Sequence, residues 1–512
     1  MFMSKLSIIP APKSIKVFPE FADSRLPVVK NVLPKMGEDD FLLRTGQEGV
    51  TIEASAESGF YYGEKVLEQL RFQFPDKLPC LELRDSPAYL YRSFHIDTAR
   101  HYVPLEELKR MADTAASFRL NKFHWHFSDD QGWRIESKAF PKLHEIGARR
   151  KGDHMGQCNS DAEEHFYYSQ EEVCELVAFC QERNIEIVPE IDIPGHVTAL
   201  LAAYPMYSCT GAEMESATTI GIFPDILCPG KEDTFTFLFA LLDEMCELFP
   251  GQFFHIGGDE TPKIRWNACP ACQSRMKAEG LTDTRQLQGW MMNRIAAHLR
   301  THGKRAIAWN EAALGGNLDT DIIIQVWNDD PKDPSLKALS KEKDENGKPT
   351  SPNQGISAKL LRKGHDLIIS NMLGSYCDYP YAYIKPKMIY EWPIMPQKCE
   401  ELHAEAAEHI LGLECLIWTE HIRDAAALER LAWPRFAAKA ERAWLGEDAP
   451  GYKDFSMRMK VLFPYLEEKV PGATPPSGWS PGPIRSMKEM LDFMKNVSRK
   501  DRKIYQEAQA EV

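Results

Sequence analysis

The sequence predicts an α/β protein: a closed (β/α)8 TIM barrel preceded by a small α+β domain and followed by a C-terminal helical extension. Between about residues 87 and 445, short apolar runs alternate with amphipathic helical stretches, the pattern of repeated βα units and a parallel sheet. Eight apolar runs can be counted, and eight βα units close naturally into a barrel. The runs are residues 93–98, 122–127, 186–191, 252–256, 305–309, 321–327, 366–370 and 410–418.

The elements before the barrel are expected to form a separate domain, residues 1–86. Strand-like runs occur at 14–17 and 49–52, and a helix is predicted over 63–72. The pattern changes after Asp85-Ser86-Pro87, which marks the start of the barrel domain, residues 87–445. Because 512 residues exceed a single barrel of roughly 250 residues, the chain has room for appended domains.

Amphipathic helices are predicted between most of the strands, at residues 105–118, 170–182, 235–248 and 286–301. The C-terminal extension, residues 446–512, is predicted to form helices over 452–469 and 484–510, joined by a loop rich in Pro and Gly. We expect this extension to pack against the barrel without contributing chemistry.

Charge and hydropathy argue against two classes of partner. The formal net charge is −14, from 61 basic and 75 acidic residues, and no basic segment is concentrated enough to neutralise phosphates, so nucleic acid is not expected. No stretch approaches the roughly 20 apolar residues that span a bilayer, so no membrane partner is expected. The start of the chain shows no signal peptide, but the compartment stays open: cytoplasmic, or secreted or periplasmic if a signal was trimmed. We expect a monomer or a homodimer.

Twelve cysteines in 512 residues are too few for a disulfide scaffold. One group differs from the rest, because Cys269 and Cys272 form a C-x-x-C pair and Cys209 and Cys228 precede them in a predicted long loop. These four could bind a structural zinc ion, pair as disulfides or remain free thiols. Their spacing matches no standard zinc finger, so the three alternatives stay open.

The main functional signal lies at the C-terminal ends of the predicted strands, where a barrel of this type places its active site. Almost every strand ends in a carboxylate or an aromatic side chain. The set comprises Asp97, Arg100, Asp129, Asp130, Asp192, His196, Asp259, Glu260, Trp309, Asn310, Glu311, Trp327, Asn328, Asp329, Tyr376, Asp378, Trp418 and Glu420. Aromatic rings stack on the apolar faces of sugars, while carboxylates, Arg and amides bind hydroxyl groups. The combination predicts a sugar-binding site.

Within this set, Asp259 and Glu260 follow an apolar strand and two glycines that allow backbone and ligand to approach closely. Ordinary glycosidases hold two carboxylates on opposite sides of the scissile bond, about 5 Å apart for retention or roughly 6.5 to 9.5 Å for inversion. The side chains of adjacent residues leaving a strand diverge. This pair therefore does not fit the ordinary arrangement.

A substrate-assisted mechanism fits the pair better, because there the sugar's own 2-acetamido oxygen attacks the anomeric carbon. The enzyme then needs one general acid and one group that holds the acetamido N–H. Glu260 is predicted to protonate the leaving oxygen and then to activate water, for which a raised pKa is useful. Asp259 is predicted to orient the acetamido group and to stabilise the positive charge of an oxazolinium-type intermediate.

The motifs of this chain resemble those of glycoside hydrolase family 20, the β-N-acetylhexosaminidases. The resemblance covers most of the chain and is carried by residues 58–63 (SGFYYG), 97–100 (DTAR), 124–134 (HWHFSDDQGWR), 189–196 (PEIDIPGH) and 255–260 (HIGGDE), together with Arg92. It implies a retaining exo-hydrolase that releases terminal β-linked GlcNAc or GalNAc from glycans, with a small α+β domain before the catalytic barrel. It also implies that no metal or organic cofactor is needed.

The resemblance assigns roles to individual residues. Asp259 is similar to the acetamido-orienting acid, Glu260 to the general acid/base, and Tyr376 to the tyrosine that donates a hydrogen bond to the acetamido oxygen. The resemblance further implies that His196 and either Asp129 or Asp130 form a relay behind Glu260. Trp309, Trp327 and Trp418 are similar to the tryptophans that enclose the acetamido methyl group and form the floor under the sugar. Arg92 and Glu420 are similar to the groups that bind the 3-, 4- and 6-hydroxyls, and Asp378 is a further substrate-binding residue.

Two departures and three alternatives remain. Asn310 stands where the family commonly has an acid, and a long charged insert at 329–352 leaves the leaving-group preference open. A metal-dependent barrel hydrolase is one alternative, because His124 and His126 imitate the H-x-H pair of such enzymes and His196, His255 and Asp259 could complete a site. A non-catalytic sugar-binding barrel and a disaccharide-releasing relative are the others.

Overall fold

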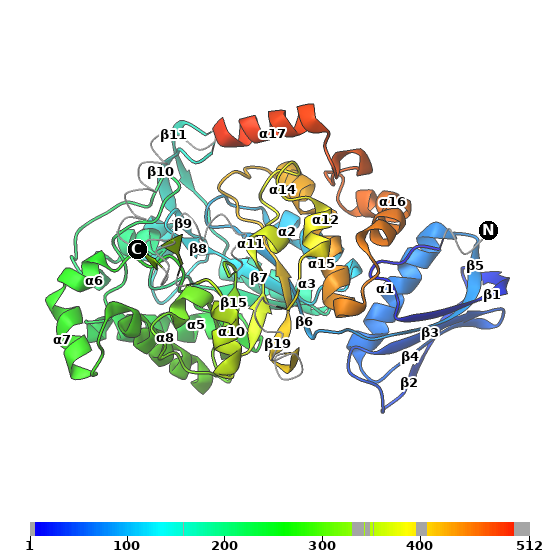
Figure 1. Ribbon diagram of the computed structural model, residues 1–512, viewed down its shortest axis with the longest axis horizontal. Helices are drawn as coiled ribbons and strands as arrows, with labels where there is room; N and C mark the ends of the chain where they lie inside the picture. The colour runs from blue at the N-terminus through cyan, green and yellow to red at the C-terminus, as the bar shows by residue number, and fades with distance from the viewer. Residues whose placement is uncertain are drawn as a thin grey trace.

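The computed structural model describes residues 6–156, 158–329, 342–343, 349–351, 353–395 and 407–495. Figure 1 shows a sheet with one helix near the N-terminus, beside a larger barrel ringed by helices. The sheet has the strand order β1-β5-β3-β4-β2, with β1 Ser14–Asp23, β2 Val28–Val32, β3 Phe41–Gly46, β4 Gly49–Ala54 and β5 Lys77–Asp85. Helix α1 (Glu57–Gln73) covers one face, because Tyr62, Val66 and Leu70 pack fully buried with Phe41 and Ile52 of the sheet.

Eight parallel strands close into a barrel in the order β12-β13-β14-β15-β18-β19-β6-β7. They are β6 Tyr91–Asp97, β7 Lys122–His126, β12 Glu186–Glu190, β13 Phe253–His255, β14 Arg305–Trp309, β15 Ile323–Val326, β18 Leu367–Ile369 and β19 Ile410–Cys415. Each overlaps one of the eight predicted runs. The predicted (β/α)8 barrel with an N-terminal α+β unit and a helical C-terminal region is therefore confirmed.

The helices outside the barrel follow the sequence periodicity closely. Helices α2 (Leu105–Ser117), α3 (Gln170–Gln181), α5 (Glu232–Leu248) and α8 (Thr284–Thr301) lie where helices were predicted. Helix α3 begins at a capping box, because the Ser169 hydroxyl accepts from the Glu172 N–H and the Glu172 carboxylate accepts from the Ser169 N–H. The remaining helices near the barrel are α4 Thr198–Ala203, α6 Ile264–Ala268, α7 Pro270–Ala278, α10 Ile356–Arg362, α11 Met372–Ser375, α12 Pro386–Glu391, α14 Ala425–Ala432 and α15 Arg435–Leu445.

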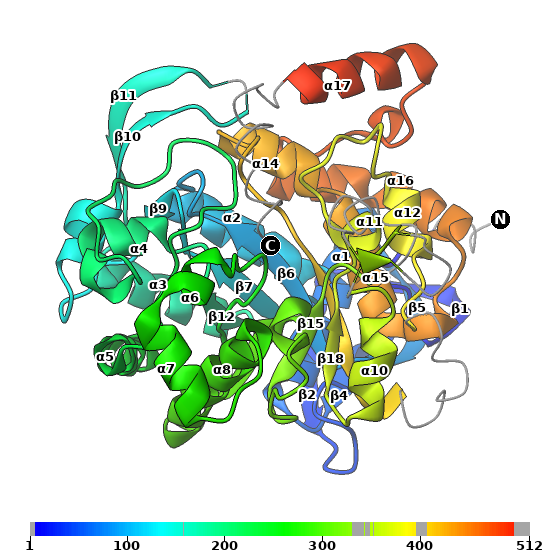
Figure 2. The same ribbon diagram turned by 60° about the vertical axis from the view of Figure 1, so that its left-hand side comes forward.

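The C-terminal region packs back onto the earlier parts of the chain. Helix α16 (Tyr452–Lys469) has the predicted bounds, and its Tyr465 hydroxyl donates to Glu68 of α1 at 2.8 Å. Helix α17 (Pro483–Lys495) lies beside the hairpin of β10 (Arg149–Asp153) and β11 (Ser160–His165), as Figures 1 and 2 both show. The rest of the helix predicted over 484–510 lies outside the described residues, and so does most of the insert at 329–352.

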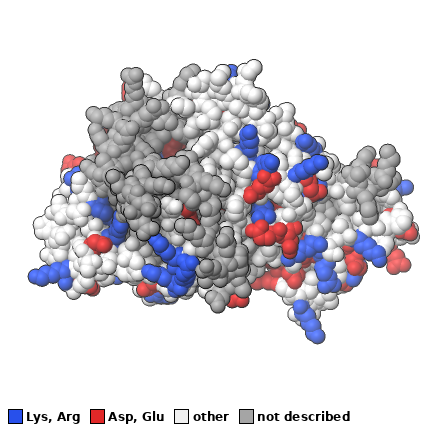
Figure 3. Space-filling model, in the orientation of Figure 1, with Lys and Arg blue, Asp and Glu red and all other residues white. Residues whose placement is uncertain are grey.

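The surface shows mixed charge on the side that Figure 3 presents. There, Lys and Arg side chains are interspersed with Asp and Glu rather than gathered in one basic patch. In the part of the chain that the structure describes, no helix combines the length and the apolar character needed to cross a membrane.

Candidate active site

A cavity of about 360 Å³ lies at the C-terminal ends of the barrel strands. Eight of the eleven predicted site residues line it: His196, Asp259, Glu260, Trp327, Tyr376, Asp378, Trp418 and Glu420. Its volume lies near the lower end of the range for small-ligand sites, about 300–1,000 Å³. The strand ends thus bring residues spread over more than 200 positions of sequence around one small space.

The turn after β13 places the two carboxylates in this cavity. Gly257 and Gly258 have positive φ angles of 64° and 110°, and a Cβ on Gly257 would lie only 1.8 Å from the Asp192 carboxylate. Glu260 also has a positive φ of 41°, and its N–H donates to Glu311 Oε2 at 2.7 Å. The left-handed turn and the close packing of Asp192 therefore require the two glycines. The sequence predicts them instead as positions where a ligand approaches the backbone.

Burial sets the protonation of the carboxylate pair. It raises the pKa of Glu260 to about 8, with His196 opposing the shift. Burial also raises the pKa of Asp259 above its ordinary value. Among the described residues, Asp259 Oδ1 is enclosed with no hydrogen-bond partner. Glu260 is therefore a protonated acid near neutral pH, and Asp259 keeps one enclosed carboxyl oxygen without a partner among the described residues.

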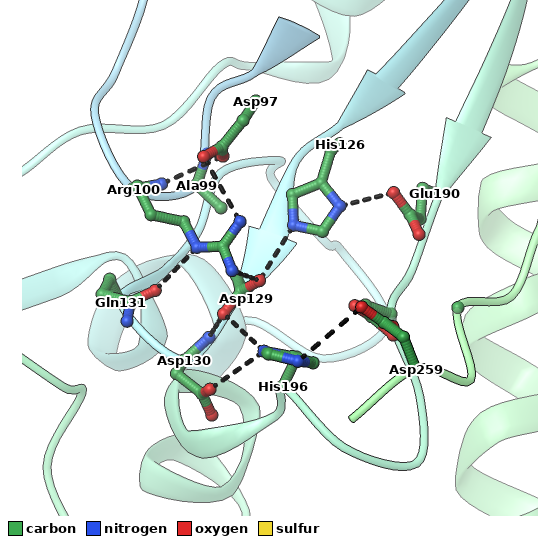
Figure 4. Close-up of polar contacts among 12 residues, drawn as sticks. Asp97, Ala99, Arg100, His126, Asp129, Asp130, Gln131, Glu190, His196 and Asp259 are labelled. Carbon is green, nitrogen blue, oxygen red and sulfur yellow. Dashed lines mark hydrogen bonds and ion pairs between the residues drawn. The ribbon is translucent and has the colours of Figure 1, made fainter. Parts of the chain in front are cut away.

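His196 connects Asp259 to the acids behind it, Asp129 and Asp130, as Figure 4 shows. Its Nε2 lies 3.7 Å from Glu260 Oε2 and 3.9 Å from Asp259 Oδ2. Its Nδ1 lies 3.2 Å from both Asp129 Oδ1 and Asp130 Oδ2. Although burial opposes it, Asp129 holds the pKa of His196 well above its ordinary value. The imidazolium is thus a positive charge placed directly beside the two carboxyl groups.

The choice between Asp129 and Asp130 has a clear structural basis. Asp129 accepts from Arg100 at 2.6 Å and contacts His126 Nε2 at 3.0 Å, and these positive neighbours hold its pKa well below the ordinary value although burial opposes them. Asp130 also accepts from the backbone N–H of Thr198 at 3.0 Å. Both acids therefore hold His196, and Asp129 is the one tied to further charges.

Aromatic rings form the walls and the floor. The ring of Tyr376 lies 6.4 Å from that of Trp327 and 6.3 Å from that of Trp418. Trp309 is fully buried beneath them, 6.1 Å from Trp418, and its indole N–H donates to Glu190 at 2.8 Å. Trp309 consequently supports the site from below, whereas the other three rings face the cavity.

Two further carboxyl groups line the other side. Burial raises the pKa of Asp378 to about 8, and the nearby Glu420 adds to the shift. Burial likewise raises the pKa of Glu420. The guanidinium of Arg100 lies over the Trp418 ring at 5.0 Å and also lines the cavity. These groups give the cavity polar and charged atoms beside the Trp418 ring.

The prediction that Arg92 binds a sugar hydroxyl is wrong. Arg92 is the second residue of β6, at the N-terminal end of the barrel, and it is fully buried. Its guanidinium donates to the Arg119 carbonyl at 2.9 Å, to Asp39 at 3.0 Å and to the Tyr62 hydroxyl at 2.8 Å. It therefore joins the barrel to the N-terminal sheet, and Arg100, just beyond the other end of β6, is the arginine in the cavity.

Other cavity residues were not singled out from the sequence. Gln131, Ile220 and Gly221 reach the cavity from loops, and Phe493 reaches it from α17. The C-terminal extension, expected to pack against the barrel without contributing chemistry, thus adds an apolar side chain, Phe493, to the cavity lining. Gln131 lies within the 124–134 motif, whereas no local pattern marks Ile220, Gly221 or Phe493, since a single Phe on a surface helix is ordinary.

Three of the four histidines of the metal-hydrolase alternative do not line the cavity, whereas His196 does. His124, His126 and His255 are fully buried and surround Glu190, at 3.1 Å for His124 Nε2 and 2.9 Å for His255 Nδ1, with a short contact from His126. His124 also contacts Glu414 at 2.9 Å. The H-x-H pair therefore forms part of an ion-paired barrel interior and does not line the cavity.

Comparisons with known proteins agree with this geometry. Residues 89–345 and 350–447 match Glycosyl hydrolase family 20, catalytic domain. A beta-hexosaminidase of Porphyromonas gingivalis is 33% identical over 443 residues, 84% of this chain and 54% of that protein, so the chain spans about half the length of this relative.

Solved structures show the same relationship. The crystal structure of a beta-N-acetylhexosaminidase is 27% identical, with a TM-score of 0.79, over 90% of this chain and 95% of that one. A GH20 exo beta-N-acetylglucosaminidase from Vibrio harveyi, in complex with N-acetylglucosamine, is 26% identical with a TM-score of 0.78, over 92% of this chain and 78% of that one. Because the family match extends over more than half of the sequence and takes in the whole barrel, the chain belongs to glycosyl hydrolase family 20.

Proposed function

We propose that the protein is a retaining exo-β-N-acetylhexosaminidase, which hydrolyses terminal β-linked GlcNAc or GalNAc from glycans through an oxazolinium-type intermediate. One observation carries this proposal: Asp259 and Glu260 project into the cavity on the same side, 3.9 and 3.7 Å from the same nitrogen of His196. The ordinary retaining pair places its nucleophile across the glycosidic bond from the acid, whereas Asp259 is the direct chain neighbour of Glu260 and lies beside the same ring nitrogen of His196. The nucleophile is then supplied by the substrate.

In the first step the acetamido oxygen attacks the anomeric carbon, and the bond to the leaving oxygen breaks. Glu260 gives its proton to that oxygen, which its pKa of about 8 makes possible at neutral pH. Asp259, which lines the cavity, accepts a hydrogen bond from the acetamido N–H through its carboxylate and stabilises the positive ring that forms.

In the second step the Glu260 carboxylate removes a proton from water as the water attacks the anomeric carbon. The acetamido oxygen leaves, and two inversions give overall retention. The His196 imidazolium, fixed by Asp129 and Asp130, stabilises the Glu260 carboxylate between the two steps.

The remaining walls of the cavity suit a single terminal sugar. Trp418 offers a flat face, while Asp378, Glu420 and Arg100 offer acceptors and donors for its hydroxyl groups. The small volume favours one residue removed from a chain end. The Vibrio harveyi structure, which contains N-acetylglucosamine, supports the same class of sugar.

Replacing Asp259 with Asn tests the proposed role of that residue. The variant keeps the size of the side chain but presents an amide where a charged acceptor is needed, so we expect kcat to fall by about 10²–10³-fold. Turnover of p-nitrophenyl N-acetylglucosaminide and N-acetylgalactosaminide measures the loss and also shows which sugar is preferred. Glu20 is exposed on β1, so Glu20→Gln, which also replaces a carboxylate with an amide, serves as the control and is expected to keep wild-type turnover. Wild-type turnover by Asp259→Asn contradicts the proposal.

A further inference from the structure

Four cysteines from two separate chain segments meet away from the active-site cavity. Cys209 and Cys228 belong to the long connection between α4 and α5, Cys269 stands between α6 and α7, and Cys272 lies in the first turn of α7. Cys228 and Cys272 are fully buried, Cys269 is nearly so, and Cys209 is partly exposed. The cluster thus joins the segment that follows strand β12 to the segment that follows its neighbour in the barrel, β13.

The sulfur positions have the geometry of a metal site. The Sγ atoms of Cys228 and Cys272 are 3.6 Å apart, and the pairs Cys209–Cys272 and Cys228–Cys269 are each 3.8 Å apart. All four lie within 4.8 Å of one another. A disulfide needs about 2.05 Å, which none of these pairs approaches. Four sulfurs bound tetrahedrally at about 2.3 Å from Zn²⁺ lie about 3.8 Å from each other.

The surrounding contacts hold the two segments together at the cluster. A Cβ on Gly230 would lie 2.3 Å from the backbone carbon of Ala271, so only glycine permits this approach. The Trp266 indole donates to the Leu227 carbonyl at 2.9 Å, and Arg265 pairs with Asp225 through two bonds of 3.0 Å. The sulfurs therefore converge inside a packed, fixed scaffold, as a structural metal site requires.

We propose that Cys209, Cys228, Cys269 and Cys272 bind one structural Zn²⁺ ion as a tetrathiolate. All four positions around the ion are filled by protein, so the ion has no open position for catalysis. It stabilises the link between the connection that carries Ile220 and Gly221 to the cavity and the segment that directly follows Glu260. The ion supports the cavity wall and takes no part in hydrolysis.

The wild-type protein provides the first test, independent of turnover. We expect about one zinc per chain by elemental analysis after purification without chelator, released by a mercurial thiol reagent. Replacement by Co²⁺ is expected to give the intense thiolate charge-transfer and visible bands of a tetrahedral tetrathiolate site. X-ray absorption is expected to show four sulfurs at about 2.3 Å. A protein that binds neither Zn²⁺ nor Co²⁺ overturns the proposal, whether thiol titration finds the four cysteines free or paired as disulfides.

Matched variants locate the ion. Cys228→Ser and Cys272→Ser are expected to lose most of the bound zinc and to unfold at a lower temperature. Cys246 is a buried cysteine of α5 outside the cluster, so Cys246→Ser is expected to keep the bound zinc and the wild-type unfolding temperature. Zinc that remains at one per chain in Cys228→Ser, or is lost in Cys246→Ser, contradicts the assignment. If the cluster variants do not fold, the cobalt spectrum and the sulfur count of the wild type decide the question.

Discussion

Glu260, partly buried in the cavity, and Glu190, fully buried in the barrel interior, are shifted in opposite directions by their environments. Glu190 is surrounded by His124, His126 and His255, which hold its pKa well below the ordinary value although burial opposes them. Burial dominates at Glu260 and raises its pKa to about 8. The difference teaches that burial alone does not mark a catalytic acid; burial with incomplete charge compensation does.

The two sites also contribute differently to the molecule. The interior ion pairs fix Trp309, whose indole N–H donates to Glu190, and so hold the floor of the cavity in place. The rim has a carboxylic acid, Glu260, that lines the cavity and a carboxyl oxygen of Asp259 that has no hydrogen-bond partner among the described residues. We infer that the interior supplies rigidity, whereas the rim keeps its polar groups available for the reaction.

The largest expected effect comes from Glu260→Gln. An amide of the same size cannot protonate the leaving oxygen, so kcat/KM for chitobiose is expected to fall by about 10²–10⁴-fold. Its unfolding temperature should stay equal or rise, because the substitution removes an under-compensated acid. Kinetics and thermal unfolding on the same preparation check both expectations. A variant that is fully active, or that is inactive because it is unfolded, breaks the comparison.

Glu190→Gln is expected to show the reverse pattern. It leaves three buried histidines without their shared anion, and breaking a buried ion pair costs about 3–5 kcal/mol of folding free energy. Denaturant unfolding monitored by tryptophan fluorescence measures the loss. Stability equal to that of the wild type would show that the interior charges do not support the fold.

The pH dependence of kcat/KM sharpens the assignment of the acid. Glu260 acts while protonated, so activity is expected to be lost as the pH rises through about 8. Because the positive His196 lowers the pKa of Glu260, His196→Asn is expected to raise that pKa and move the alkaline limb to higher pH. An alkaline limb that moves to lower pH, or stays unchanged, would separate His196 from the proton on Glu260.

A smaller contrast is expected between Arg92, in β6, and Arg100, just beyond the C-terminal end of β6. Arg100→Lys loses the planar guanidinium that lines the cavity. KM is expected to rise by about 10–150-fold, as for the loss of a charged hydrogen bond of about 1.5–3 kcal/mol. Arg92→Lys is expected to lower the unfolding temperature and leave KM unchanged, because its partners are Asp39, Tyr62 and the Arg119 carbonyl. An increased KM in Arg92→Lys alone would reverse this assignment.

The sequence predicted the barrel well because apolar strands and amphipathic helices are local patterns. It predicted the cavity largely correctly because parallel strands bring their C-terminal ends to one rim. It placed Arg92 wrongly, since the role came from the motif resemblance, although the predicted strand at 93–98 already puts Arg92 at the N-terminal end, opposite the rim that holds the cavity. It also missed Phe493, which reaches the cavity only through the packing of α17.

The cysteine cluster shows the same limit in another form. The C-x-x-C pair was visible in the sequence, but its partners lie in a different loop and only the fold brings the four sulfurs within 4.8 Å of one another. Similarly, the adjacent Asp129 and Asp130 offered two candidates for one contact, and the structure shows that His196 Nδ1 is shared between both.

The central claim is that the substrate's acetamido oxygen is the nucleophile. Its most direct test is the rate of hydrolysis of p-nitrophenyl glucosaminides whose N-acetyl group carries increasing numbers of fluorine atoms. Fluorine withdraws electrons from the amide oxygen and weakens it as a nucleophile, so kcat/KM is expected to fall steeply with each substitution. Rates that do not depend on fluorination would show that an enzyme group attacks the anomeric carbon, which contradicts the mechanism proposed for Asp259 and Glu260.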